Sequence, residues 1–232
     1  HPHAAMAKVQ TIAVESGKKI WVDVIDPTPD LLADLANQHG LHPRFVKDCL
    51  DPHHLPKLEQ SEDTTFIIAR ALDDQAVPGA ETVQQLTRKV AIFYSPRVTL
   101  TIHRVDQPFL KKLREEWQEL SSQSKTQKHL VNSLLARIIA SYQPLVESTS
   151  TQLDALEEQV FKRTGDGRLL ESAYSLKRVI SIAERLVRMI EEAVPPNEGP
   201  PRDAPFVRRL HDQISRTLFS FDDLELRIDH LL

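Results

Sequence analysis

A short stretch of the chain brings several metal-ligating residue types close together. It holds three histidines and two aspartates within thirteen residues: His42, Asp48, Asp51, His53 and His54. Imidazole and carboxylate groups together suit Zn²⁺ or a similar divalent metal. Neighbouring histidines such as His53 and His54 are seldom both ligands, however, and His42 stands directly before Pro43, where a side chain can begin a helix. We therefore expect structural or solvated roles for these residues.

The other reactive residue types lack the companions that catalysis needs. Cys49 falls on the apolar face of a predicted helix, where a cysteine is usually a small, inert, buried hydrophobe. A strand end and a helix cap explain His103 and Asp106. The sequence has no Gly-x-Ser-x-Gly motif, its six glycines form no phosphate-binding loop, and Gly165-Asp166-Gly167 is typical of a turn. We therefore expect no enzymatic activity.

Residues 1–105 alternate strand-like and helix-like patterns, which predicts an α/β domain. Thr28 caps a first helix that ends before Gly40, and a second short helix begins near Pro43. A polar, proline-containing loop then leads to the next strand. Buried strands are predicted over Lys19–Val24, Thr64–Leu72, Val83–Tyr94 and Val98–Ile102. The last three strands should form a meander.

Residues 106–204 have helical periodicity, beginning with Asp106 as a cap. A continuous apolar stripe from Leu130 to Val160 predicts one helix of about nine turns. A return helix over Leu169–Val194 ends at Pro195-Pro196. Together these two helices predict a long antiparallel hairpin.

Residues 205–232 form a third predicted region, a stalk helix that Pro205 opens. Its apolar residues recur about every 3.5 positions: Val207, Leu210, Ile214, Leu218, Phe221, Leu224, Ile228 and Leu231. This spacing predicts a coiled-coil-like seam that a partner must cover, and no stop signal precedes Leu232, so we expect the natural helix to continue. Packing on the preceding hairpin as a three-helix bundle fits the periodicity equally well.

Composition excludes several classes of protein. The 232 residues are 41% hydrophobic and 27% charged, as in a folded globular chain. A net charge of -4 gives no broad basic field, so nucleic acid is not an expected partner. The single cysteine fits a reducing, cytoplasmic setting, and no apolar run approaches the roughly 20 residues that span a bilayer. We expect this part of the chain to be soluble.

A series of short motifs runs along nearly the whole chain. They are Trp21-Val22-Asp23, Asp26-Pro27-Thr28, Gly40-Leu41-His42-Pro43, Asp48, Leu55-Pro56-Lys57-Leu58-Glu59, Phe66-Ile67-Ile68, Val98-Thr99-Leu100-Thr101-Ile102-His103, Leu156-Glu157-Glu158 and the stretch from Pro205 to Leu232. In order and spacing they resemble the cytosolic part of the CorA magnesium transporters. The Gly-Met-Asn signature of that family lies in its membrane part, which this sequence does not contain.

The resemblance implies both a fold and a function. The fold is α+β: an α/β/α cytosolic domain, a long antiparallel helical hairpin and a truncated stalk helix. Five copies would form a homopentameric funnel on the cytoplasmic side of the cell inner membrane, conducting or gating Mg²⁺ or, alternatively, Co²⁺, Ni²⁺ or Zn²⁺. In that family, Mg²⁺ held between subunits by acidic side chains keeps the pore closed, and Mg²⁺ binds through one or two carboxylates while keeping several waters.

The sequence departs from the family at the sensing positions. Asp48 resembles one sensing aspartate, but its partner position on the stalk is Arg209 and a second acidic position is Ala136. A guanidinium cannot ligate a cation, so we predict an Asp48–Arg209 ion pair within or across subunits and a weakened or missing metal-bridged state. The sequence therefore allows Mg²⁺ as a cofactor but does not require it. The departure also favours a ZntB-like branch that handles zinc.

Two further alternatives remain open at the level of sequence. The acids Glu157, Glu158, Glu171, Glu191 and Glu192 surround the predicted hairpin, and we expect a solvated helix face, with attraction of hydrated cations as the alternative. The whole chain is also consistent with a soluble oligomeric scaffold or regulatory protein that uses the hairpin for protein binding.

Overall fold

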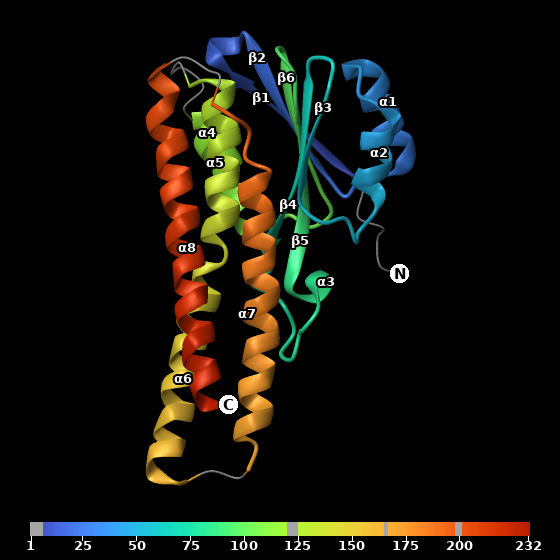
Figure 1. The fold of residues 1–232 in the computed structure, drawn as a ribbon. Helices are drawn as coiled ribbons and strands as arrows, with labels where there is room; N and C mark the ends of the chain where they lie inside the picture. The colour runs from blue at the N-terminus through green and yellow to red at the C-terminus, as the bar shows by residue number, and fades with distance from the viewer. Residues whose placement is uncertain (1–6, 120–124, 165–166, 198–200) are drawn as a thin grey trace.

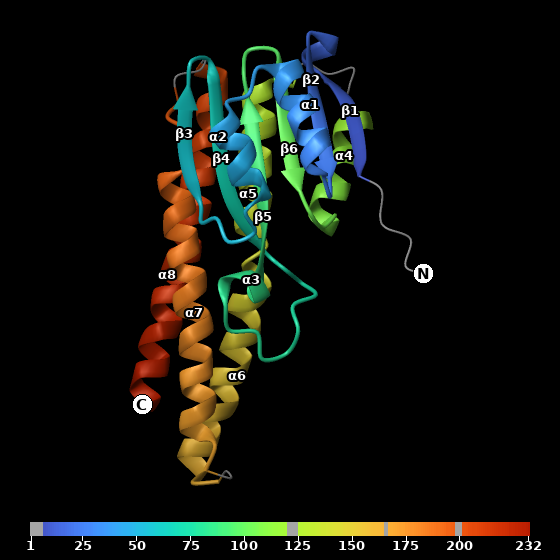
Figure 2. The same ribbon diagram turned by 90° about the vertical axis from the view of Figure 1, so that its right-hand side faces the viewer.

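A computed structural model describes residues 7–119, 125–164, 167–197 and 201–232 of the chain. Its centre is a six-stranded sheet in the order β1-β2-β6-β5-β4-β3 (Figures 1 and 2). The strands are β1 Lys8–Val14, β2 Lys19–Ile25, β3 Lys57–Ser61, β4 Thr64–Leu72, β5 Thr87–Tyr94 and β6 Val98–His103. β2 and β6 pair in parallel, and all other pairs are antiparallel. The predicted α+β fold is confirmed.

One face of the sheet is covered by two short helices, α1 (Pro29–His39) and α2 (Pro43–Leu50). The Thr28 hydroxyl accepts a hydrogen bond from the Leu31 amide, and Gly40 ends α1 in the left-handed region at φ 68°. Both are the caps that the sequence predicts. Beneath α2, the rings of Phe45, Phe66 and Phe93 form a compact aromatic core.

The opposite face of the sheet carries α4 (Pro108–Glu119) and α5 (Gln127–Ala140), and one continuous core joins it to the long helices beyond. Alternation along β2 sends Trp21 to this face and Val22 to the other, as the two-residue period of a strand requires. The Trp21 ring meets Trp117 of α4 edge-on, with 6.5 Å between ring centroids.

Three long helices, α6 (Gln143–Lys162), α7 (Leu169–Glu192) and α8 (Ala204–Leu231), extend well past the sheet (Figure 1). The predicted nine-turn helix over Leu130–Val160 is wrong, because the chain breaks at Ser141 and Tyr142 and begins α6 with Pro144 in its first turn. Proline removes an amide donor and clashes with the preceding turn, so it favours a new helix start here. The antiparallel pairing of α6 with α7 is present, while Gly165 and Asp166 lie outside the described residues.

The apolar seam of α8 is buried within the protomer itself. Its residues from Val207 to Ile228 pack against α5, α6 and α7, and Ile214, Phe221 and Ile228 are fully inaccessible. The three-helix alternative is therefore the correct one, and the expectation that a partner must cover these side chains is wrong. Periodicity could not decide this, because a seam buried by a neighbouring helix and one buried by another subunit have the same spacing.

The remaining differences from the predicted elements have local causes. Residues Val83–Leu86 form a short helix, α3, rather than the start of a strand, because the Thr82 hydroxyl caps it by accepting from the Gln85 amide. Strand β3 lies in the predicted loop and carries the polar sequence Lys57–Ser61, which suits a sheet edge. Strand β1 on the other edge was not predicted. None of the described helices is long and apolar enough to cross a membrane.

Candidate functional site

Asp48 lies in the last turn of α2, opposite the first residue of β3. Its carboxylate accepts a hydrogen bond from the Lys57 ammonium, and the His54 Nε2 atom lies 3.5 Å from Asp48 Oδ1. Lys57 Nζ also contacts Glu59 Oε1 at 2.6 Å. Burial alone would lower the pKa of Lys57, but the hydrogen bonds to Asp48 and Glu59 outweigh burial and raise it. Asp48 therefore already has a cation in contact with it.

The predicted pairing of Asp48 with Arg209 is not formed within the protomer. Arg209 is exposed on α8 and its guanidinium lies over the Phe206 ring, 5.7 Å from the centroid. Ala136, which the family resemblance puts at a second sensing position, lies on α5 and packs against the large hydrophobic core. Its carbonyl accepts a hydrogen bond from Gln213. Within one protomer, neither of these two positions therefore supplies an acidic ligand to Asp48, and the nearby Glu59 carboxylate contacts the same Lys57 ammonium.

The other members of the histidine and aspartate group have structural roles. His42 Nδ1 accepts a hydrogen bond from the Arg44 amide at 3.1 Å and so caps α2. Asp51 Oδ1 accepts from the His53 amide at 2.9 Å. These contacts agree with the prediction of structural roles. Cys49 is buried as predicted, and burial raises the pKa of its thiol to about 12, which leaves it unreactive at neutral pH.

A buried ionic network beneath α4 was not predicted. The Asp23 carboxylate, fully inaccessible on β2, accepts hydrogen bonds from the Thr101 hydroxyl and from Arg114 Nη1 at 3.0 Å. Arg114 reaches on to Asp106 with two bonds of 2.8 and 2.7 Å. Burial opposes ionisation of Asp106, but the contact with Arg114 outweighs it and lowers the pKa of that carboxyl. Asp106 is thus an ion-pair partner instead of the simple helix cap expected.

His103 completes this network from the end of β6. Its Nε2 atom lies 2.8 Å from Asp23 Oδ1, and its Nδ1 atom lies 2.9 Å from the Val105 carbonyl. The ring therefore links the buried Asp23 carboxylate on β2 to the backbone just after β6. The signal available in the sequence was an aspartate inside the apolar strand Trp21–Val24, since a buried carboxylate needs a cationic partner.

Three carboxylates meet between α7 and α8. The oxygens of Glu184, Asp222 and Glu225 all lie within 4.8 Å of one another, a spacing that could hold a divalent cation. A hydrogen bond with Glu184 raises the pKa of Asp222. Arg188 already contacts Glu184 at 2.8 Å and Asp222 at 3.5 Å, so part of the negative charge is neutralised. Sequence reasoning missed this group because its members come from two helices.

The acids singled out around the hairpin are not gathered into one site. Glu157 pairs with Arg227 of α8 at 3.1 Å, and Glu158 pairs with Lys162 one turn along α6 at 2.6 Å. Glu191 and Glu192 end α7, at the opposite end of the helix from Glu171. These contacts agree with a solvated helix face.

The comparison with known families decides the relationship. A family model described as CorA-like Mg2+ transporter protein matches residues 16–232. The chain belongs to this family. Among curated relatives of the CorA-like family, the cobalt/magnesium transport protein CorA of Thermotoga maritima is 23% identical over 224 residues, which is 90% of this chain and 62% of that protein. The putative metal ion transporter YfjQ of Bacillus subtilis is 26% identical over 158 residues, or 68% of this chain and 47% of that protein.

Solved structures support the fold. The soluble domain of CorA from Methanocaldococcus jannaschii gives a TM-score of 0.75 at 17% identity, covering 98% of this chain and 95% of that one. The ZntB cytoplasmic domain from Vibrio parahaemolyticus gives 0.72 at 14% identity, covering 97% and 96%. The chain spans about half to two thirds of the curated CorA-like relatives it matches. The resemblance read from the sequence motifs is confirmed.

Proposed function

We propose that this chain is the cytosolic domain of a homo-oligomeric divalent-cation transporter, placed on the cytoplasmic side of the cell inner membrane. The match of the CorA-like family model over residues 16–232 carries this proposal. Mg²⁺ is the first candidate for the transported ion, because the family description names it. The similarity to the ZntB cytoplasmic domain keeps Zn²⁺ as the alternative cargo. The domain itself would act as a funnel and gate, without enzymatic activity.

Exposed apolar side chains support assembly into an oligomer, with a pentamer as the expected state. Phe219 and Leu226 are 74% and 57% exposed, and their seven-residue spacing puts them on one side of α8, away from its buried seam. Near the hairpin tip, Phe161 is 88% exposed. Large apolar groups left in water are typical of a surface that another protein covers. The exposed side of α8 with Phe219 and Leu226 therefore supports assembly. The buried seam of the same helix does not, because the protomer covers it itself.

The surroundings of Asp48 support a gate that Mg²⁺ does not close in the manner of the family. A Mg²⁺ ion at Asp48 would have to displace the Lys57 ammonium and would find Arg209 at the expected partner position. Mg²⁺ dehydrates reluctantly and needs carboxylates rather than cations around it. We therefore retain Asp48 as the candidate metal residue, with a metal-bridged closed state that is weak or missing.

The test is transport by the complete gene product in liposomes. Vesicles loaded with a Mg²⁺-sensitive dye, and parallel vesicles with a Zn²⁺-sensitive dye, are diluted into each ion at equal ionic strength. Flux of Mg²⁺ above protein-free vesicles supports the proposal, and flux of Zn²⁺ alone assigns the zinc alternative. Absence of divalent-ion flux, together with a gene product that remains in solution, would overturn transport in favour of a soluble scaffold.

A further inference from the structure

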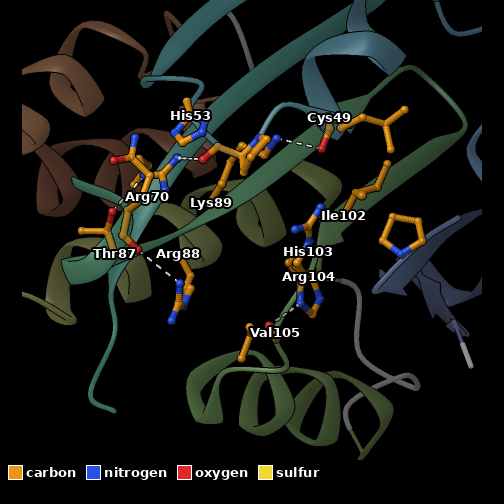
Figure 3. A pocket seen from close by; sticks show the side chains of 14 residues that line it. Cys49, His53, Arg70, Thr87, Arg88, Lys89, Ile102, His103, Arg104 and Val105 are labelled. Atoms are coloured by element: carbon orange, nitrogen blue, oxygen red, sulfur yellow. Dashed lines mark hydrogen bonds between the residues drawn. The ribbon is translucent and has the colours of Figure 1, made fainter. Parts of the chain in front are cut away.

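A pocket opens at the edge of the sheet where β2, β4 and β6 all end. Its cavity volume is about 180 Å³, and its walls come from Pro27 after β2, Arg70 in β4, and Ile102 to Val105 at the end of β6 (Figure 3). β2 and β6 run in parallel, and β4 runs the same way because it is antiparallel to β5. The crevice outside the carboxyl ends of such strands is where open α/β sheets bind ligands.

The charge in this pocket is of one sign. Four cationic side chains line it, from the neighbouring strands β4 and β5 and from the residue after β6: Arg70, Arg88, Lys89 and Arg104. Among the described residues that line it, none is an aspartate or glutamate. Two carboxylates lie close by, since Asp73 pairs with Arg88 at 3.0 Å and Asp51 influences both Arg70 and Lys89. A positive excess remains inside the cavity.

Two of the cations are fixed in place by backbone carbonyls. Lys89 Nζ donates to the carbonyls of Asp48, Cys49 and Asp51 at 2.8, 2.7 and 2.5 Å. Arg70 is buried, with Nη1 donating to the carbonyls of Pro52 and His54 at 3.1 and 3.0 Å. Neutral carbonyls hold these ammonium and guanidinium groups without cancelling their charge.

Burial is the main influence on the pKa of Lys89, with smaller contributions from its charged neighbours. Burial, together with the charges of Arg70 and Arg104, lowers the pKa of Lys89 to about 8, while Asp51 and Cys49 act in the opposite direction. Arg104 is exposed at the pocket rim, and within the described part of the chain it forms no hydrogen bond or ion pair. An anion in the cavity would meet Arg70 and Lys89 already held in position, and the Arg104 guanidinium could move to contact it.

We propose that this pocket binds a small anion of the phosphate class. A phosphate carries about two negative charges and several acceptor oxygens, which suits the guanidinium donors of Arg70, Arg88 and Arg104, while the Lys89 ammonium adds positive charge beside them. A divalent cation would be repelled by the same groups. The pocket is therefore separate from any path for transported metal, and the proposal stands independently of the proposed function.

The experiment is a titration of the chain, labelled with ¹⁵N, with inorganic phosphate and in a second arm with glycerol phosphate at constant ionic strength. Arg104→Ala removes the free guanidinium without breaking a contact of the fold, and Arg104→Lys restores the charge. Arg97→Ala is the matched control, because Arg97 is an exposed arginine in the turn at the opposite end of β6. Chloride replaces phosphate in the reference titration.

We expect saturable amide shifts at residues 102–105 and 87–89, an affinity about tenfold lower in Arg104→Ala, partial recovery in Arg104→Lys and no change in Arg97→Ala. Tighter binding of glycerol phosphate would identify an esterified ligand, and equal binding the free anion; either supports the site. No saturable shift in either arm, shifts centred elsewhere, or equal weakening in Arg97→Ala would overturn the proposal.

Discussion

Asp23 and Asp48 both hold a cation next to the sheet, yet they lie in opposite environments. Asp23 is fully inaccessible and contacts Arg114, His103 and Thr101 at once, whereas the Asp48 side chain keeps 17% of its surface exposed and has Lys57 as its close cation. An ion deprived of water depends on every partner it has, while an ion at the rim can exchange a partner for water. We therefore expect the contacts of Asp23 to contribute more to stability than those of Asp48.

The largest expected effect comes from Arg114→Met. This change leaves Asp23 buried with one cation removed, and loss of one partner of a buried pair costs about 3–5 kcal/mol. Chemical denaturation should show that loss in the free energy of unfolding. The matched control is Arg44→Met, whose exposed pair with Glu59 should be worth no more than about 1 kcal/mol. Equal losses in the two variants would contradict the comparison.

The same network should govern stability at acid pH. The contact with Arg114 lowers the folded-state pKa of Asp106 below its unfolded value, so its stabilisation is present above about pH 4 and is lost as pH falls through the folded pKa. Unfolding free energies measured between pH 6 and 3 should fall less steeply in Arg114→Met than in the wild type. Parallel curves would show that the ion pair between Asp106 and Arg114 does not contribute to the pH dependence of stability.

A smaller effect is expected at the rim. Asp48→Asn should cost about 1 kcal/mol, because the Lys57 ammonium keeps Glu59 as a partner and can reach solvent. A double-mutant cycle with Lys57→Met measures the coupling between the two side chains in the free energy of unfolding. A coupling free energy as large as the loss of stability in Arg114→Met would show that Asp48, like Asp23, is mainly structural.

The smallest effect on stability is expected for Arg209→Glu, at an exposed position. The single substitution should not create a response to Mg²⁺, because the Lys57 ammonium still contacts the Asp48 carboxylate. Combined with Lys57→Gln in the complete gene product, it should allow Mg²⁺ to raise the unfolding free energy by about 1.4 kcal/mol at tenfold excess over Kd. The melting temperature measured with and without Mg²⁺ checks this. A response in Arg209→Glu alone would contradict the role given to Lys57.

The sequence predicted those parts of the fold that local rules determine. Thr28, Gly40 and His42 set helix ends through contacts within four residues, and their predicted roles are found in the structure. The break at Ser141 had a local signal in Pro144, which the apolar stripe across it obscured. The partner of the α8 seam had no local signal, since burial by α7 and burial by a second subunit require the same residues.

The candidate site was harder to predict for the same reason. Asp48 was identified through the family motif, but its partner Lys57 lies on a polar edge strand that resembles a loop in sequence. The contact between Asp23 and Arg114 joins residues 91 positions apart. Likewise, the cationic pocket arises from strands that become neighbours in the folded sheet. Such groups depend on topology, which short-range patterns do not specify.

The most direct test of the account is Mg²⁺ flux through the complete, reconstituted gene product while Mg²⁺ on the cytosolic face is raised. We expect flux to continue and wild type and Asp48→Asn to behave alike, because the Lys57 ammonium already contacts Asp48 and an arginine at position 209 offers no carboxylate to a cation. Flux that cytosolic Mg²⁺ shuts in the wild type but not in Asp48→Asn would contradict it.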